Sequence, residues 1–443
     1  MTQPTRSVTR RDFLSTTAAL SAAAVLTPEL LARTAKPKAS DALKVGFIGC
    51  GGRGTGAMLQ ALRADPGTVL WAIGDAFEDK IDPCLGHLRN AMAELDDEQG
   101  TDTWAQKITH SDRRFFGLGA YKKVIDSGVD VVILTTPPNF RPQHLAYAVD
   151  AGKHVFCEKP VAVDGPGVRS VLESAKKAKA QGTSLMSGFC WRHQDQVVQA
   201  FDKLAAGGIG DLHTIQTTYN TTGWLGYKTR QPGWSDTEFQ LRNWQYFSPL
   251  SGDHIVEQSV HSIDWINWAM GGADPVRCYA VGGRQVRDDV PEAGNVYDHF
   301  SVTWEYANGV RAYNMCRHWP NSPSDNTGYF MGSKGKMNMN PWTGNHTIEG
   351  ETPWRGDAGG NDMYQREHDT LFAAIRAGKP FNDGERMAHS TLLAIMGREA
   401  AYTGQVITWE QALNSTMDLN PDPWAFSTRP VPLIAKPGTS KFS

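Results

Sequence analysis

The spacing of apolar residues changes along the chain, and each pattern predicts a different kind of element. Residues 43–48 and 131–135 are short, almost continuous apolar runs, which are typical of buried strands in a parallel sheet. In residues 299–306 and 310–319 apolar and polar positions alternate, as in a strand with one face on a core. Helices are expected over residues 55–62, 143–151, 164–181, 364–378 and 389–403. The pattern predicts an α/β fold in which buried strands precede a second, sheet-rich region.

Length and composition narrow the class of protein. A chain of 443 residues is too long for one ordinary domain, so two or three are expected. The net charge near −3, without a basic block, argues against nucleic acid as a partner. The six cysteines contain no C-x-x-C pair, so they form neither a disulfide framework nor a zinc set.

The 14 tryptophans and 12 tyrosines could stack on sugar rings or fill the core. Long aromatic loops at 221–251 and 341–354 are expected to be binding loops.

The first forty residues are expected to be an export signal and linker rather than part of the fold. Arg6, Arg10 and Arg11 precede an apolar stretch at residues 13–26 that is too short to span a membrane. Residues 9–14, TRRDFL, resemble the twin-arginine signal, whose pattern is Ser/Thr-Arg-Arg-x-Phe-Leu. The expected partner is the twin-arginine translocase, and the expected location is periplasmic or otherwise exported; a floppy basic tail is the alternative. No later apolar run reaches the length of a membrane span.

A glycine motif directly follows the first predicted strand. Gly49, Gly51 and Gly54 form G-x-G-x-x-G between that strand and a helix, and an acidic residue, Asp75, ends the second strand. In dinucleotide-binding folds the first glycine allows a tight turn, the second lets the backbone approach a pyrophosphate, and the third lets helix and strand pack closely. This context predicts a dinucleotide site that includes Gly52; a glycine-rich structural turn is the alternative.

Two side chains beside the motif bear on the choice of cofactor. Asp75 would accept hydrogen bonds from the adenosine ribose and would repel a 2′-phosphate, which favours NAD. Arg53 argues for NADP, because a guanidinium can bind a phosphate. The expected cofactor is therefore NAD, with NADP as the alternative.

Five more residues are expected at the cofactor because they follow predicted strands. Thr136, Pro137 and Asn139 come directly after one strand, and Glu158 and Lys159 come after the next. In parallel sheets of this kind, ligands bind at the carboxyl ends of the strands.

With these motifs in place, the sequence resembles the Gfo/Idh/MocA oxidoreductases, the family of glucose-fructose oxidoreductase and inositol dehydrogenase. The resemblance spans residues 43–412 and rests on the motifs at 49–54, 136–137, 151–160 (AGKHVFCEKP), 188–194 (GFCWRHQ), 257–264 and 331–336 (MGSKGK). It implies a Rossmann NAD(P)-binding domain, an α/β domain with a large, mostly antiparallel sheet, and a homo-oligomer. The expected divisions are a signal and linker at 1–40, the Rossmann domain at 41–160, the substrate and oligomerisation domain at 161–412 and a tail at 413–443.

The stretch at residues 251–265 places titratable side chains at helical spacing. His254, Glu257, His261 and Asp264 stand at i, i+3, i+7 and i+10, which would stack them on one face of a single helix. Oxidation of a secondary alcohol needs a base at the hydroxyl, and histidine titrates near neutral pH. Two other interpretations stay open from the residues alone: a core histidine satisfied by Glu257, and a zinc or iron site formed by His254, Glu257 and His261. No other signal supports a metal, and none is expected.

The resemblance assigns roles to these residues. It implies that His261 is the acid/base, that Glu257 orients its imidazole, and that Lys159 contacts the reacting hydroxyl. Trp191 and Arg192 are expected to help close the site over the cofactor. Further expected substrate contacts are Asp264, His254, Trp224 and Tyr227.

The expected function is an exported NAD(P)-dependent oxidoreductase that acts on a secondary hydroxyl of a sugar or glycoside. Outside the cytoplasm there is no pool of free nicotinamide nucleotide, so the cofactor is expected to be tightly bound and recycled in place. One alternative is a redox-neutral glycosidase or lyase that oxidises a ring carbon, eliminates a substituent and restores the cofactor. The other is a carbohydrate-binding protein without turnover, which the presence of Lys159 and His261 argues against.

Overall fold

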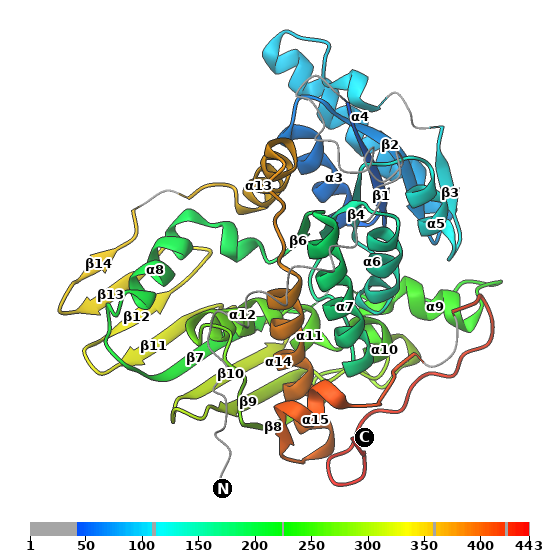
Figure 1. Cartoon of the computed structure of the whole chain (residues 1–443). Coiled ribbons are helices and arrows are strands. Elements are labelled where there is room, and N and C mark those ends of the chain that lie inside the picture. Colours follow the sequence, from blue (N-terminus) through cyan, green and yellow to red (C-terminus); the bar gives the residue numbers. More distant parts are fainter. Residues whose placement is uncertain (1–41, 109–111, 224–225, 358–359, 421–423, 443) are drawn as a thin grey trace, which may run out of the picture. The chain divides into compact units, whose positions relative to one another are not determined.

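The computed structural model describes residues 42–108, 112–223, 226–357, 360–420 and 424–442 (Figure 1). The expected export signal at residues 1–40 lies outside these ranges. Within them, no helix is long and apolar enough to span a bilayer.

The first sheet is parallel and has the strand order β3-β2-β1-β4-β5-β6. This is the order of the dinucleotide-binding fold, in which the reversal between β1 and β4 opens a crevice at the carboxyl ends of the strands. The strands are β1 (Leu43–Ile48), β2 (Thr68–Asp75), β3 (Arg114–Phe116), β4 (Val131–Leu134), β5 (His154–Cys157) and β6 (Leu185–Ser187). The connecting helices include α3 (Gly52–Ala64), α4 (Ile81–Gln99), α5 (Ala120–Asp126), α6 (Arg141–Asp150) and α7 (Gly165–Gln181).

Burial explains why the strands of this sheet were readable from sequence. All four residues of β4 and five of the six in β1 are buried, so both strands carry almost only apolar residues. The predicted parallel sheet is thereby confirmed. The sheet also continues through α7 to β6, beyond residue 160, where we expected the first domain to end.

The second sheet has the order β14-β13-β12-β11-β7-β10-β9-β8-β15. Only β7 and β10 pair in parallel, so the expected mostly antiparallel sheet is confirmed. Its strands are β7 (Leu212–Thr221), β8 (Arg277–Gly283), β9 (His299–Glu305), β10 (Arg311–His318), β11 (Gly328–Gly332), β12 (Gly335–Met339), β13 (Thr347–Gly350), β14 (Trp354–Arg355) and β15 (Ile407–Thr408).

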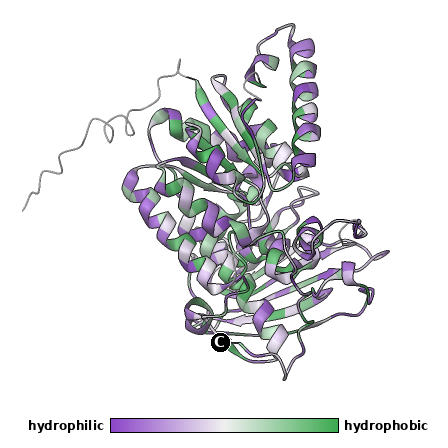
Figure 2. Ribbon diagram, turned by 90° about the vertical axis from the view of Figure 1, so that its right-hand side faces the viewer, coloured by the Kyte–Doolittle hydropathy of each residue, from purple (hydrophilic) through white to green (hydrophobic). Residues whose placement is uncertain are grey.

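One face of this sheet packs into the core. Buried residues alternate with less buried ones along β9 and β10, as the period of two predicted. Helices α8 (Asp195–Ala205), α12 (Val260–Ala269) and α14 (Gly384–Thr403) contact the sheet. In Figure 2 the strands of the first sheet are coloured mostly as hydrophobic, whereas the strands of this second sheet carry both hydrophobic and hydrophilic residues. The other sheet face carries exposed apolar side chains, of which Val281 is 70% exposed.

The chain returns to the first sheet near its C-terminus. Helix α13 (Met363–Ala377) packs beside α3, and Figure 1 shows the two helices next to each other although they are far apart in sequence. Arg376 of α13 pairs with Asp65 at the end of α3, at 2.7 Å. The remaining helices are α9 (Asp236–Arg242), α10 (Ser248–Ser251), α11 (His254–Glu257) and α15 (Trp409–Asn414).

Candidate active site

The glycine motif forms a tight turn between β1 and α3. Gly49 has φ +106°, a backbone conformation that favours glycine. A Cβ on Gly54 would lie 2.0 Å from the Gly49 carbonyl oxygen, so this glycine lets the helix approach the turn. By contrast, a Cβ on Gly51 or Gly52 would meet no other described atom within 4 Å. The first turn of α3 therefore presents its backbone N–H groups to open space, which suits a pyrophosphate.

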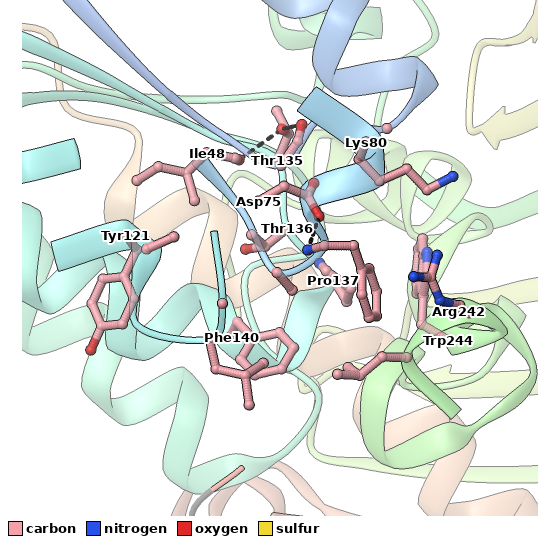
Figure 3. Close-up of a pocket in the computed structure, with 18 of the residues that line it drawn as sticks. Ile48, Asp75, Lys80, Tyr121, Thr135, Thr136, Pro137, Phe140, Arg242 and Trp244 are labelled. Carbon is pink, nitrogen blue, oxygen red and sulfur yellow. Dashed lines mark hydrogen bonds between the residues drawn. The ribbon is translucent and has the colours of Figure 1, made fainter. Parts of the chain in front are cut away.

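A cavity of about 330 Å³ lies against this turn (Figure 3). A volume of this size suits part of a dinucleotide. It brings together six of the predicted cofactor residues, which come from the carboxyl ends of β1, β2 and β4: Gly49, Gly51, Gly52, Asp75, Thr136 and Pro137.

Asp75 is the acidic group of this cavity. Its carboxylate accepts hydrogen bonds from the backbone N–H groups of Cys50, at 2.6 Å, and Phe77, at 2.9 Å. Burial raises its pKa, while these two hydrogen bonds oppose that shift. The side chain is thus fixed beside the glycine turn, where an adenosine ribose would lie in this fold.

Several cavity residues were not predicted. Tyr121, Phe140 and His144 form an aromatic wall, with Tyr121 and His144 stacked at 4.0 Å. Lys228 and Arg242 belong to the long loop after β7, for which aromatic content predicted only an unspecified binding role. Sequence spacing could not assign them to this cavity, because the contact depends on how two distant segments pack.

Lys159 follows β5 and reaches the segment that carries the predicted catalytic histidine. Its Nζ donates to the Glu257 carbonyl oxygen at 2.5 Å and lies 3.3 Å from the Glu257 carboxylate. Both side chains are 13% exposed, so solvent screens this pair only weakly. The preceding residue, Glu158, accepts a hydrogen bond from Arg53 at 2.5 Å.

The single helix expected over residues 251–265 is wrong. Helix α11 ends at Glu257 and α12 begins at Val260, with a turn between them. The turn is held by β10, because the Gln258 side chain bonds His318 at 2.7 Å and the Ser259 hydroxyl donates to Asn314 at 2.9 Å. These bonds interrupt the helical stacking of the four titratable residues.

The four residues consequently face different partners. His254 is fully buried and bonds Asp253 at 3.0 Å, while its ring lies 4.3 Å from that of His318. Asp264 accepts two hydrogen bonds from Arg192, at 2.7 and 2.9 Å, and one from Ser390. In the described ranges, no three His, Cys, Asp or Glu side chains are grouped so that they could hold a metal ion.

His261 lies in an aromatic pocket near Lys159. Its ring centroid is 5.1 Å from that of Trp191 and 6.5 Å from that of Tyr219. Burial lowers its pKa well below the usual value, and the positive charges of Lys159 and Arg53 lower it further. The imidazole is therefore neutral at neutral pH and can accept a proton.

Glu257 does not orient the His261 ring as expected. The Glu257 carboxylate pairs with Lys159, and His261 Nδ1 is buried without a hydrogen-bond partner among the described residues. The helix break at residues 258–259 accounts for the difference, since it removes the one-turn spacing between the two side chains.

The arginines of the site have structural partners. Besides Glu158, Arg53 donates to the fully buried Glu367 of α13 at 3.0 Å, and its guanidinium lies over the Tyr364 ring at 4.6 Å. Its guanidinium thus joins α3, β5 and α13, rather than standing available for a 2′-phosphate. Arg192 is held by Asp264 and lies over the Trp268 ring at 4.5 Å.

Three other predicted residues lie apart from Lys159 and His261 or outside the described ranges. Asn139 lines a neighbouring pocket of about 630 Å³, and its carboxamide has no hydrogen-bond partner in the described part of the chain. Tyr227 donates to Asp288 at 3.2 Å and packs on Tyr246 at 4.8 Å. Trp224 lies outside the described residues.

Comparison with known proteins identifies the two domains separately. Residues 43–189 match the oxidoreductase family with an NAD-binding Rossmann fold, and residues 197–338 match the GFO/IDH/MocA C-terminal domain. The 2,7-anhydro-N-acetylneuraminate hydratase of Escherichia coli is 26% identical over 229 residues, 51% of this chain and 55% of the relative. The myo-inositol 2-dehydrogenase of Thermotoga maritima is 24% identical over 254 residues, 57% of this chain and 62% of the relative.

Solved structures extend the similarity at the level of the fold. A levoglucosan dehydrogenase, solved in complex with NADH and levoglucosan, has a TM-score of 0.62 and 18% identity, covering 83% of this chain and 99% of that one. The matches to the curated relatives span about half of their length, 44% and 55% for two of them.

The glycine geometry generates a paired prediction. Gly54→Ala should destabilise the fold, by about 1–3 kcal/mol or more, because the new methyl group meets the Gly49 carbonyl. Gly51→Ala should melt like the wild type but bind NAD more weakly, because its methyl group enters the open space beside the turn. Thermal unfolding and NAD titration measure the two effects. A Gly54 variant that melts at the wild-type temperature, or a Gly51 variant that binds NAD with wild-type affinity, would contradict this assignment.

Proposed function

This chain belongs to the Gfo/Idh/MocA family of oxidoreductases, and on that premise we propose that it oxidises a secondary hydroxyl of a sugar or glycoside with NAD. The observation that carries the proposal is the contact of Lys159 with the segment that leads into His261. This contact brings the Lys159 cation and the segment of the neutral His261 imidazole close to the end of β5. Strand β5 pairs with β4, and the residues that follow β4 line the cavity.

The cavity fits NAD by its own chemistry. Gly51 and the first turn of α3 would hold the pyrophosphate, and Asp75 would accept the ribose hydroxyls. When bound, the nicotinamide would supply the acceptor for a hydride. NAD rather than NADP is proposed because Asp75 lies in the cavity, whereas Arg53 is engaged by Glu158 and Glu367.

Lys159 and His261 would act on the substrate hydroxyl together. Two hydrogen bonds to Glu257 fix the Lys159 ammonium and leave one of its three N–H groups for a substrate oxygen. Its positive charge lowers the effective pKa of a bound hydroxyl. The neutral imidazole of His261 would take the hydroxyl proton at a ring nitrogen.

The surroundings of His261 suit a sugar. Trp191 packs edge-on against Trp342, which is 55% exposed, at 6.2 Å between ring centroids. The Tyr219 ring stacks on that of Trp191, at 6.0 Å between ring centroids, and its centroid is 6.5 Å from that of His261. Aromatic faces of this kind bind the C–H faces of sugar rings, and the names of the inositol and levoglucosan dehydrogenases support a polyol or sugar substrate.

A redox-neutral elimination is the second candidate. Burial, followed by the negative charge of Glu257, raises the pKa of Tyr219, so this phenol stays protonated beside His261. A base and an acid side by side suit removal of a proton next to an oxidised carbon and protonation of a leaving group. The relative named as a hydratase supports this class.

Export, a retained cofactor and a homo-oligomer complete the proposal. Residues 9–14 support twin-arginine export, and the exposed apolar residues of the second sheet support contact with another copy of the chain. Outside the cytoplasm the cofactor must stay bound and be recycled by a second substrate or within one catalytic cycle. A non-catalytic carbohydrate-binding role would not require Lys159 and His261.

Lys159→Met should keep the fold and bound NAD but lower the rate of sugar-dependent change at the nicotinamide absorbance band about 100-fold or more. Lys176→Met is the matched control, because Lys176 is 73% exposed and pairs with the equally exposed Glu173 across one helical turn. Near wild-type turnover of the Lys159 variant would remove this residue from the mechanism. Mass analysis of products from a glycoside panel, without added acceptor, separates the two candidates. Oxidation should stop at about one ketone per bound NAD, because nothing reoxidises the NADH, whereas elimination should release a substituent over many turnovers.

His261 should titrate below its usual range. The acidic limb of kcat/KM is therefore expected below pH 6.5, because a proton binds the depressed imidazole only at lower pH. His261→Asn should abolish turnover, whereas His213→Asn, on the exposed side of β7, should not. A chelator should leave the wild type active. An acidic limb above pH 6.5 that disappears in the His261 variant, or inactivation by chelator reversed by zinc, would overturn this assignment.

Export is testable by cell fractionation. With both Arg10→Lys and Arg11→Lys, the protein should remain in the cytoplasm, whereas Arg6→Lys should still be exported. Equal fractionation of all three proteins would contradict a twin-arginine signal.

A further inference from the structure

One side of the dinucleotide cavity is closed by a segment of the second domain. After β7, residues 226–246 cross to the first domain and carry α9. Lys228, Arg242 and Trp244 of this segment line the cavity together with Asp75 and other first-domain residues. Figure 3 shows Arg242 and Trp244 across the cavity from the strand ends.

Arg242 is the main anchor of this segment. Its guanidinium donates to both carboxylate oxygens of Asp79, at 3.0 and 2.8 Å, and to Glu238 at 2.8 Å. It also lies over the rings of Phe77, at 4.0 Å, and Trp234, at 4.9 Å. Asp79 and Phe77 belong to the first domain, directly after the strand that ends at Asp75, so Arg242 ties the two domains together at the cavity.

Lys228 is held over the same cavity by a second contact. The Asn243 side chain accepts from the Lys228 backbone N–H at 2.8 Å and donates to its carbonyl at 2.9 Å. Burial lowers the pKa of Lys228, and the nearby charges of Lys80 and Arg242 lower it further. Lys80, Lys228 and Arg242 line the cavity, whereas Asp75 is the carboxylate that lines it among the described residues. The charge of Arg242 is compensated by Asp79 and Glu238, so the excess of positive charge comes from the two lysines. A phosphate-bearing ligand would offset this excess of positive charge.

The C-terminal tail lies over this segment as a second layer. Residues 424–430 fasten α9 from outside: Thr237 donates to the Ser427 carbonyl at 3.2 Å, and Gln240 to the Arg429 carbonyl at 2.8 Å. The tail also contacts the first domain, because the ring centroid of Phe426 lies 5.9 Å from that of Phe77. We call residues 226–246 and 424–430 together the adenosine cap.

We propose that the adenosine cap binds the adenosine half of NAD and slows its release, with Lys228 as a charged contact, Trp244 as an apolar contact and Arg242 as the anchor that holds the cap against the first domain. This inference rests on the proposed NAD site. It adds a second set of cofactor residues, from the other domain, to those of the glycine turn. The Arg242–Asp79 pair would act as the latch, because the two domains must separate there before the adenosine can leave.

Release of bound NAD tests the latch directly. Protein loaded with radiolabelled NAD is mixed with excess unlabelled NAD, and the rate of label loss is followed. Arg242→Ala should release the nucleotide about ten-fold faster or more. Asp79→Asn should also speed release, although Asp79 does not line the cavity, because it removes the partner of Arg242. The double variant should be no faster than the faster single variant, since both changes break one contact.

Two controls keep the outcomes separate. Arg366→Ala breaks an ion pair with Asp195, in which both side chains are about half exposed, and should leave the release rate unchanged. Lys176→Met, which changes a side chain that is 73% exposed, should also release NAD at the wild-type rate. Asp79 is 57% exposed, so Asp79→Asn is expected to fold even if Arg242→Ala does not.

Wild-type release rates in both the Arg242 and the Asp79 variants would overturn the cap while leaving the proposed oxidoreductase intact. Strictly additive effects in the double variant would overturn the latch, because they would mean that the two residues act independently. A wild-type protein that binds no NAD would overturn the proposed function and the cap with it.

Discussion

The contact of Lys159 with Glu257 is the link on which the proposed chemistry depends. Lys159 extends from a strand of the first sheet, and Glu257 belongs to the segment that leads into His261. Because the Lys159 ammonium binds both the backbone and the side chain of Glu257, it holds the end of β5 against the segment that leads into His261. The cavity beside the glycine turn is lined by residues that follow β1, β2 and β4, and β5 is the neighbour of β4 in the same sheet.

The electrostatics around His261 follow from that arrangement. Lys159 and Arg53 each lower the imidazole pKa, and burial lowers it most. Arg53 is itself held between Glu158 and Glu367 and does not line the cavity beside the glycine turn. Under the proposed function, His261 would be a neutral base beside the Lys159 cation, which is a pairing that suits removal of a hydroxyl proton.

Features set by short spacing were predictable from the sequence, whereas features set by packing were not. The glycine turn and the buried strands depend on neighbouring residues, and the structure places them as expected. Glu158 and Lys159 follow β5 as predicted, but neither lines the cavity beside the glycine turn, so their role at the cofactor stays a prediction. The break after Glu257 depends on side chains of β10, such as Asn314, that lie more than fifty residues away. Periodicity alone could not reveal it, and the role expected of Glu257 toward His261 failed for that reason. The cap escaped prediction in the same way, since Arg242 finds Asp79 only in the folded chain.

The most direct test of the account is to denature the purified full-length protein and identify the nucleotide that it releases. The geometry of Gly51, Asp75 and the adenosine cap predicts NAD, close to one molecule per chain, after gel filtration and dialysis without added cofactor. Release of NADP would contradict the role of Asp75. A nucleotide-free protein whose activity rises in proportion to added NAD would contradict a retained cofactor.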